Sequence, residues 1–270
     1  MDIPDGWGLD GKVALVSGGG AAGDGIGNGR AAAILLAKAG ARVVVADRDL
    51  KLARRTVEMI ESISGQAIAV EVDVTRSADC AAMVKTAVER FGRLDVLVNN
   101  AGVFSNFLLA ALAPAEFNRI LAVNVGGAFL CTKAAAFQMR RQGDGGSIIN
   151  ITSIDAVHPS GAGLSHYGTS KHAIWGLTKT MALELGPDGI RVNAIAPGPS
   201  LTEGAVEFVE AGAPAGIDVD AQWRAYEARI PLRRLADPDD VGRTALFLAS
   251  GLGSYLNGAQ IVVDGGLLTA

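Results

Sequence analysis

Residues 148–171 read IINITSIDAVHPSGAGLSHYGTSK, and the prediction of both fold and site starts from this stretch. Its first four residues are a short apolar run, typical of a buried parallel strand, which ends at Thr152 and Ser153. Tyr167 and Lys171 stand at the start of an apolar-periodic segment, residues 166–185, which predicts a helix. A spacing of four residues places both side chains on one helix face.

A tyrosine beside a lysine predicts acid–base chemistry. The pKa of an isolated tyrosine is about 10, so the phenol is a poor base at neutral pH. A neighbouring ammonium group favours the phenolate and lowers that pKa, so Tyr167 can exchange a proton with a carbonyl or alcohol oxygen. Ser153 can hold the same oxygen by a hydrogen bond. The alternative is a surface Tyr and Lys on an ordinary helix, and the pattern alone is weak.

Strands and helices alternate along the rest of the chain. Short apolar runs predict strands at 12–17, 41–46, 67–72, 94–98, 148–151, 191–195 and 259–263. Longer periodic segments predict helices at 28–39, 50–63, 77–91, 114–141, 166–185 and 238–248. This order indicates parallel strands joined by right-handed crossovers, hence a doubly wound α/β sheet with helices on both faces. Without a linker or repeat, residues 1–270 are expected to form one domain, in which residues 203–230 form a substrate lid.

Polar and glycine residues gather where the predicted strands end. They are the glycine turn 18–27, Asp47, Asp73, Asn100, Ser153 and Pro197-Gly198. Ligands of such sheets bind at these carboxyl ends. Glycines 18, 25 and 27 let the backbone approach a pyrophosphate, and Asp47, twenty residues past Gly27, can accept both hydroxyls of a ribose. A dinucleotide site is therefore predicted, with a helix N-cap as the alternative role for Asp47 and Asp73.

Composition excludes several classes of partner. The 270 residues carry a net charge of −4 without a basic cluster, so neither nucleic acid nor an anionic membrane is expected to bind. Cys80 and Cys131 lie in apolar contexts, which favours two buried thiols in a reducing compartment over a disulfide or metal site. The first residues lack a signal-peptide pattern, and the longest uncharged run, 96–115, contains three Asn and a Pro. We expect a cytoplasmic protein with no metal and no membrane span.

Taken together and in order, the motifs of this chain resemble those of the short-chain dehydrogenase/reductase family over nearly its whole length. The matching residues are Ser17-Gly18, Gly25-Ile26-Gly27, Asp73-Val74, Asn99-Asn100-Ala101-Gly102, Asn124, Ser153, Tyr167, Lys171, Pro197-Gly198 and Asp264-Gly265-Gly266. The resemblance implies a Rossmann-type sheet of seven parallel strands. It also implies NAD(P)-linked interconversion of an alcohol and a ketone.

The resemblance also implies a role for each matching residue. Tyr167 is the general acid/base, Lys171 lowers its pKa and binds the nicotinamide ribose, and Ser153 orients the substrate oxygen. Asn124 holds a water in a proton relay. The implied cofactor-binding residues are Gly18, Gly25, Ile26, Gly27, Asp47, Asp73, Val74, Asn100, Tyr167, Lys171, Pro197, Ser200 and Thr202.

Three departures from the family pattern are visible. The glycine loop is three residues longer, because six residues separate Gly18 from Gly25. The interval from Ser153 to Tyr167 is one residue longer, so the loop at 157–164 is expected to bulge. Ser200 stands where Val or Ile is usual, at a position that binds through its backbone.

Substrate and cofactor type follow from residues near these motifs. The expected pocket residues are mostly apolar, which predicts a small, neutral, fairly apolar alcohol or ketone; they are Val103, Phe104, Val157, His158, Leu164 and the segment 203–223. His158 and His166 are expected to be solvated loop residues. Asp47, helped by Asp24, would repel the extra phosphate of NADP and so predicts NAD, whereas Arg48 argues the other way.

Two further expectations concern assembly and function class. The resemblance implies a homo-oligomer, a tetramer in preference to a dimer, and the apolar helices at 114–141 and 166–185 agree with it. The alternative to an NAD-dependent oxidoreductase is a catalytically inactive NAD-binding regulatory module, which would need the glycine loop and Asp47 but none of the four catalytic positions. A dehalogenase or dehydratase on the same fold is a further alternative.

Overall fold

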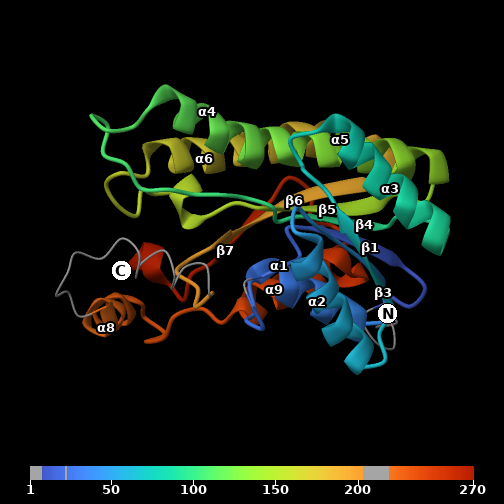
Figure 1. Ribbon diagram of the computed structural model, residues 1–270, viewed down its shortest axis with the longest axis horizontal. Coiled ribbons are helices and arrows are strands. Elements are labelled where there is room, and N and C mark those ends of the chain that lie inside the picture. The colour runs from blue at the N-terminus through green and yellow to red at the C-terminus, as the bar shows by residue number, and fades with distance from the viewer. Residues whose placement is uncertain (1–7, 22, 203–218) are drawn as a thin grey trace.

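The computed structural model describes residues 8–21, 23–202 and 219–270, and a seven-stranded parallel sheet lies at its centre (Figure 1). The strands are β1 (Val13–Ser17), β2 (Arg42–Asp47), β3 (Ala67–Glu71), β4 (Val96–Asn99), β5 (Gly146–Ile151), β6 (Ile190–Pro197) and β7 (Gln260–Val263). Their order across the sheet is β3-β2-β1-β4-β5-β6-β7, and every pair is parallel. The predicted doubly wound α/β sheet is confirmed.

Helices cover both faces of the sheet (Figure 1). One layer holds α1 (Asn28–Lys38), α2 (Leu50–Ser62) and α9 (Pro238–Ala249), and the other holds α3 (Ser77–Phe91), α5 (Gly127–Gln142) and α6 (Ser165–Leu185). Within β1, Ala14 and Val16 pack with the first layer, whereas Val13 and Leu15 pack with the second. Because successive side chains point to opposite faces, a strand buried on both faces is a nearly continuous apolar run, as the first four residues of β1 are.

The sheet changes its winding direction beside β1, which pairs with β2 on one side and with β4 on the other. A crevice for a ligand forms at such a point, outside the carboxyl ends of the strands. The loops that follow β1 and β4 meet there, since the Asn100 Nδ2 donates to the Gly18 carbonyl oxygen at 2.7 Å. The topology thus brings the glycine turn and Asn100 together.

The helix predicted over 114–141 is divided by a short π-helical segment, which is wound more widely than an α-helix. The chain forms α4 (Pro114–Leu121), then a π-helical turn, η1 (Ala122–Gly126), and then α5. Apolar periodicity does not distinguish a π-helical turn from an α-helix, so this turn could not be predicted from the pattern of residues. Such turns occur often at functional sites, and Asn124 lies within this one.

The expected lid falls largely outside the described residues. Residues 203–218 are among those that the structure does not describe, and α8 (Val219–Arg229) follows them. The lid therefore stays a prediction.

One helical stretch, Pro114–Gln142, is long and apolar enough to cross a membrane by length and composition alone. Its Cys131, Ala135 and Met139 side chains are buried in the core against the sheet. The apolar character of this stretch is thus accounted for, on that face, by packing within the folded chain.

Candidate active site

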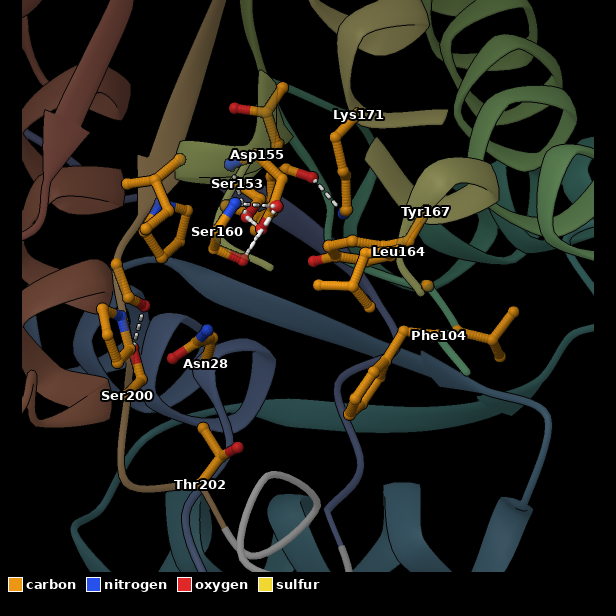
Figure 2. Close-up of a pocket in the computed structure, with 18 of the residues that line it drawn as sticks. Asn28, Phe104, Ser153, Asp155, Ser160, Leu164, Tyr167, Lys171, Ser200 and Thr202 are labelled. Carbon is orange, nitrogen blue, oxygen red and sulfur yellow. Dashed lines mark hydrogen bonds between the residues drawn. The ribbon is translucent and has the colours of Figure 1, made fainter. Parts of the chain in front are cut away.

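A cavity of about 400 Å³ lies at the carboxyl ends of β4, β5 and β6 (Figure 2). It brings together many of the residues that the sequence singled out. Those in its lining are Asn100, Ser153, Tyr167, Lys171, Pro197, Ser200 and Thr202. Asn124 lies just behind it, because its Oδ1 accepts a hydrogen bond from the backbone N–H of Val103, which lines the cavity.

Tyr167 and Lys171 lie in the first turns of α6, as the spacing predicts. The Lys171 ammonium lies 5.5 Å from the centroid of the Tyr167 ring. Its Nζ donates to the carbonyl oxygen of Ile151, at the end of β5, at 2.9 Å. The lysine ammonium is therefore held at the end of β5, two residues before Ser153, and does not extend into solvent.

The pKa values of this pair correct one expectation. Burial raises the pKa of Tyr167 to about 12; a hydrogen bond with Ser153 lowers it, and the negative charge of Asp155 raises it. Burial lowers the pKa of Lys171 to about 8, against the charge of Asp155. Contrary to the expectation, the net shift of the Tyr167 pKa is upward, because the loss of solvent around the buried phenol disfavours the phenolate. The Lys171 ammonium, which donates to the Ile151 carbonyl oxygen, is not among the causes of that shift, so its lowering effect on the Tyr167 pKa stays a prediction.

Ser153 follows Thr152 at the end of β5, and its hydroxyl both donates and accepts a hydrogen bond within the next two residues. Its hydroxyl donates to the Asp155 Oδ2 at 3.1 Å and accepts from the Asp155 backbone N–H at 3.1 Å. These bonds cap the short 3₁₀ turn η2 (Ile154–Ala156). The hydroxyl is thereby held at the strand end, facing the cavity that Tyr167 also lines.

Asn124 is held by protein partners on both sides of its amide. Its Nδ2 donates to the Val103 carbonyl oxygen and to the Ser170 Oγ, both at 2.9 Å, and its Oδ1 accepts from the Val103 backbone N–H at 2.8 Å. An amide can make four hydrogen bonds, so one acceptor site on the side chain remains. Asn124 joins the loop after β4 to the helix that carries Tyr167, and its predicted water relay stays a prediction.

The glycine turn between β1 and α1 has the close approaches that a phosphate-binding loop needs, but not all at the predicted glycines. Gly18 has a φ of +62°, and a Cβ there would lie 2.7 Å from the Ala101 Cα. A Cβ on Gly29 would lie 2.2 Å from the Gly18 carbonyl oxygen, whereas one on Gly27 would meet nothing nearer than 3.5 Å. The close-packed glycine at the start of α1 is therefore Gly29, which the sequence analysis missed.

Arg30 is a second residue of this loop that the sequence analysis missed. Its side chain is fully buried, and its Nε donates to the Thr56 Oγ1 at 2.9 Å. Its terminal nitrogens donate to three carbonyl oxygens of the lengthened turn, those of Ala21, Gly23 and Gly25. One guanidinium thus holds three carbonyl oxygens of the lengthened turn, because this planar, charged group carries five N–H donors in fixed directions.

Asp47 ends β2 and touches the glycine turn. Its Oδ2 accepts from the Gly20 backbone N–H at 2.9 Å, and its Oδ1 accepts from the Asp49 backbone N–H at 3.0 Å. The N-cap of α2 is Asp49, whose carboxylate accepts from the backbone N–H groups of residues 51 and 52. The N-cap alternative for Asp47 is therefore wrong.

Asp24 and Arg48, the other two charged residues of the predicted cofactor preference, lie at the surface. Asp24 forms an exposed ion pair with Arg55, with 2.6 Å between its Oδ1 and the arginine Nε. Arg48 is exposed, and its charge helps to lower the pKa of Asp73. The larger causes of that shift are hydrogen bonds from the side chain and backbone of Thr75. Asp73 thus closes a local turn and does not cap α3, whose N-cap is Arg76.

The remaining predicted cofactor residues divide between core and cavity. Val74 is buried in the core layer that packs against α5. Ser200 forms a backbone bridge with Ala236, and its Oγ donates to the Gly198 carbonyl oxygen at 3.3 Å. Asn28, which was not predicted, lines the cavity with a buried Oδ1 that has no hydrogen-bond donor within the described part of the chain. That oxygen is available to a bound molecule.

The substrate side is more polar than expected. Val103, Phe104 and Leu164 line the cavity as predicted, and the Phe104 ring centroid lies 6.0 Å from that of Tyr167. The lining also includes polar residues that the sequence analysis missed, namely Asn106, Asp155, Ser160 and Tyr226.

The loop from 157 to 164 has no regular helix or strand, and its expected bulge stays a prediction. Val157 and His158 are exposed and are not among the residues that line the cavity, which corrects their assignment as pocket residues.

His166 corrects a further expectation. It is fully buried at the start of α6, and its Nε2 lies 2.8 Å from the Ser105 Oγ. That hydroxyl donates to Glu116 of α4 at 2.6 Å. The histidine therefore joins α6 to α4 and is not a solvated loop residue, because α4 covers the helix face on which it lies.

Within the described ranges, no three His, Cys, Asp or Glu side chains lie together as a metal site requires. The crevice at β1 and β4, the close-packed glycine turn and the carboxylate at the end of β2 instead define the class of dinucleotide-binding α/β oxidoreductases. A sequence model of the family described as Enoyl-(Acyl carrier protein) reductase matches residues 20–268.

Relatives of known name point to the same class. L-rhamnose-1-dehydrogenase of Scheffersomyces stipitis is 40% identical over 266 residues, 96% of each chain. L-rhamnose 1-dehydrogenase (NAD(P)(+)) of Sphingomonas sp. is 40% identical over 264 residues, 96% of this chain and 97% of the relative. The crystal structure of a short-chain type dehydrogenase/reductase from Mycobacterium marinum is 36% identical, covers 97% of both chains and superposes with a TM-score of 0.86. The chain belongs to the short-chain dehydrogenase/reductase family.

Proposed function

We propose that this protein is an NAD-dependent oxidoreductase that interconverts a secondary alcohol and a carbonyl compound, with Tyr167 as the general acid/base. The observation that carries the proposal is the meeting of Ser153, Tyr167 and Lys171 in one cavity at the carboxyl ends of the strands. Each of them comes from a segment that the sheet fixes in place, since Lys171 is bonded to β5 and Ser153 follows it. Preorganised groups of this kind stabilise charge that develops on a reacting oxygen.

The residues divide the chemistry as follows. Ser153 donates a hydrogen bond to the substrate oxygen, and Tyr167 takes the hydroxyl proton in oxidation or returns it in reduction. Lys171 holds positive charge beside the phenolate that forms. A bound NAD⁺ would supply the hydride acceptor. Asn124 would hold a water that connects the site to solvent, by the one acceptor site left on its side chain.

The residues present fit a dinucleotide. Gly18 and Gly29 let the glycine turn pack closely against Ala101 and the start of α1, and the Asn28 Oδ1 is a buried acceptor in the cavity lining. Asp47 stands at the strand end where a carboxylate accepts ribose hydroxyls. Its charge favours NAD, although the Sphingomonas relative is named for both NAD and NADP.

Arg30 provides a test of the lengthened glycine turn. Arg30→Met removes the guanidinium bonds to the carbonyl oxygens of Ala21, Gly23 and Gly25 and is expected to weaken NAD binding at least about tenfold, because hydrogen bonds from a charged donor are among the stronger ones. Isothermal titration calorimetry measures the NAD dissociation constant. Arg55→Met is the matched control, because Arg55 touches the same turn only through an exposed ion pair, which contributes little. A folded Arg30→Met variant with unchanged NAD affinity would refute the bracing role.

The substrate is proposed to be small and neutral. Two relatives are named as dehydrogenases of L-rhamnose, a small sugar. Phe104 and Leu164 give the cavity apolar walls, but Asn106, Asp155 and Ser160 add polar groups that a purely apolar alcohol would not use. The cavity lining therefore favours a small substrate that carries polar groups over a purely apolar alcohol.

A panel of secondary alcohols and reducing sugars with NAD⁺, read at the absorbance of reduced nicotinamide, tests the proposed function. Turnover of panel members is the expected result. Tight NAD binding without turnover of any member would favour the inactive regulatory module instead. That alternative needs no Ser153, Tyr167 or Lys171, and here all three are present and brought together.

We also propose a homo-oligomer, a tetramer in preference to a dimer. Phe137 of α5 and Leu183 of α6 expose 66% and 82% of their surface, which is unusual for large apolar residues on neighbouring helices. Light scattering at micromolar concentration is expected to report a particle of at least twice 27.7 kDa. Phe137→Asp should shift it toward the monomer, whereas Ile63→Asp, on the opposite layer, should not. A wild-type particle of 27.7 kDa would contradict the proposal.

A cytoplasmic location is proposed on the basis of the two thiols. Cys80 and Cys131 are free and buried, as predicted, although their sulfur atoms lie only 3.6 Å apart. Two thiols this close that remain reduced suit a reducing compartment.

A further inference from the structure

Asp155 is a buried carboxylate in the wall of the cavity, two residues after Ser153 (Figure 2). It lies in the η2 turn and is only 6% exposed. Ionised carboxylates are seldom this buried unless hydrogen bonds or charges compensate them. Its partners therefore indicate what it does there.

The hydrogen bonds of Asp155 leave room for one more donor. Its Oδ1 accepts from the Ser160 backbone N–H at 2.9 Å, and the Ser160 hydroxyl lies within 3.0 Å of both carboxylate oxygens. The Ser153 hydroxyl donates to Oδ2 at 3.1 Å. These are three donors, whereas an ionised carboxylate offers about four acceptor sites.

The charge of Asp155 has opposite effects on the two members of the proposed acid–base pair. It raises the pKa of Tyr167, which disfavours the phenolate, and it raises the pKa of Lys171, which favours the ammonium. Acid–base catalysis therefore does not by itself explain a carboxylate at this position, and the contacts of Asp155 with Ser153 and Ser160 are the better guide to its task.

The Ser153 hydroxyl connects Asp155 to the substrate. A serine has one hydroxyl proton, so Ser153 donates either to Asp155 or to the substrate oxygen, and not to both. When the Ser153 hydroxyl donates to the substrate oxygen instead, the Asp155 Oδ2 loses one of its donors while it stays buried, which is unfavourable. A second hydroxyl on the substrate, beside the reacting one, can replace it. The oxygens of a vicinal diol stand about one hydrogen-bond length apart, which matches the 3.1 Å between the Ser153 Oγ and the Asp155 Oδ2.

We propose that Asp155 is a specificity-determining residue that selects substrates with a hydroxyl group on the carbon next to the reacting carbinol, as in vicinal diols and sugars. The proposal rests on the proposed function and deepens it. The second hydroxyl donates to Asp155 and is not itself transformed, so the balance is that of the proposed reaction: alcohol and NAD⁺ give a carbonyl compound, NADH and a proton. The competing explanation is that Asp155 only ties the loop at Ser160 to the end of β5.

Matched pairs of probes with NAD⁺ separate the two explanations. The pairs are cis-1,2-cyclohexanediol with cyclohexanol, 2,3-butanediol with 2-butanol, and L-rhamnose with 2-deoxy-L-rhamnose. For each pair that the wild type oxidises, kcat/KM is expected to be at least about tenfold higher for the member with the vicinal hydroxyl than for the member without it. The reason is that a site built to bond a hydroxyl rejects the analogue that lacks it. In Asp155→Asn, a change of almost no volume, the ratio should fall toward unity.

Two further variants make the outcome specific. Ser160→Ala loosens the loop but keeps the carboxylate, so the preference for the vicinal hydroxyl should persist. Asp188→Asn, an exposed carboxylate paired with Arg140 at the other end of the strands, should leave the ratio unchanged. A wild-type ratio near unity, or an Asp155→Asn variant with the wild-type ratio, would overturn the role of Asp155 and leave the proposed function standing. A protein that binds NAD and oxidises no probe of any pair would overturn both.

Discussion

Tyr167→Phe is expected to lower kcat for alcohol oxidation by at least about 100-fold, and by up to about 10,000-fold, which is the usual contribution of a general acid or base. The substitution removes the hydroxyl and keeps the ring, which packs near Phe104. The fold and the NAD dissociation constant should therefore change little. Steady-state kinetics with NAD⁺ gives kcat, and calorimetry gives the affinity.

The pH profile and a second variant make this result specific to proton transfer. Because the pKa of Tyr167 is raised, the phenolate fraction and hence the wild-type oxidation rate should climb as the pH rises above neutrality. That climb should disappear in Tyr167→Phe. Lys171→Ala should lower both kcat and NAD affinity, since the lysine is expected to stabilise the Tyr167 phenolate and to bind the nicotinamide ribose. A Tyr167→Phe variant that keeps most of its activity would remove Tyr167 from the mechanism.

Asp47 is expected to give a preference for NAD over NADP of about tenfold to several hundredfold in kcat/KM, because losing the bonds of a hydrogen-bonded charge typically costs about 2–5 kcal/mol. The phosphate on the adenosine ribose of NADP would meet the carboxylate with like charge. Asp47→Ala should narrow the preference, mainly by weakening NAD. Kinetics with each cofactor on one alcohol measures the ratio.

Asp49→Ala is the matched control for Asp47→Ala. Asp49 caps α2 two residues later, so its loss should lower stability by about 0.5–2 kcal/mol and leave the cofactor ratio unchanged. Asp24→Ala should alter the ratio less than Asp47→Ala, because Asp24 is paired with Arg55. A wild-type preference for NADP, or an Asp47→Ala variant with the wild-type ratio, would show that the carboxylate only holds the backbone at Gly20 and Asp49.

The sequence predicted what depends on local pattern. Buried parallel strands are mostly apolar, so the apolar runs of β1 and β5 were recognisable from their composition, and the alternation of such runs with helices defined the sheet. The spacing of Tyr167 and Lys171 placed both on α6 because helical geometry is local. The strand-end positions of Asp47 and Ser153 follow from the same reasoning.

The features that were missed depend on contacts between distant segments. Gly29 is needed because the Gly18 carbonyl oxygen approaches it, and no pattern within the lengthened turn distinguishes it from Gly27. Arg30 is buried only because the turn folds over it. The pKa of Tyr167 is raised because the phenol is buried. Such desolvation is a property of the assembled cavity.

The fate of the carbinol hydrogen tests the central claim most directly. The protein is incubated with NAD⁺ and with one of the alcohols that it oxidises, labelled with deuterium on the carbinol carbon. The recovered cofactor is then analysed by mass spectrometry. If Tyr167 removes the hydroxyl proton while hydride passes to the nicotinamide, the wild type should return NADH that contains the deuterium, and Tyr167→Phe should return almost none in the same time. Recovered NAD⁺ without deuterated NADH, from a wild-type protein saturated with both compounds, would contradict the account.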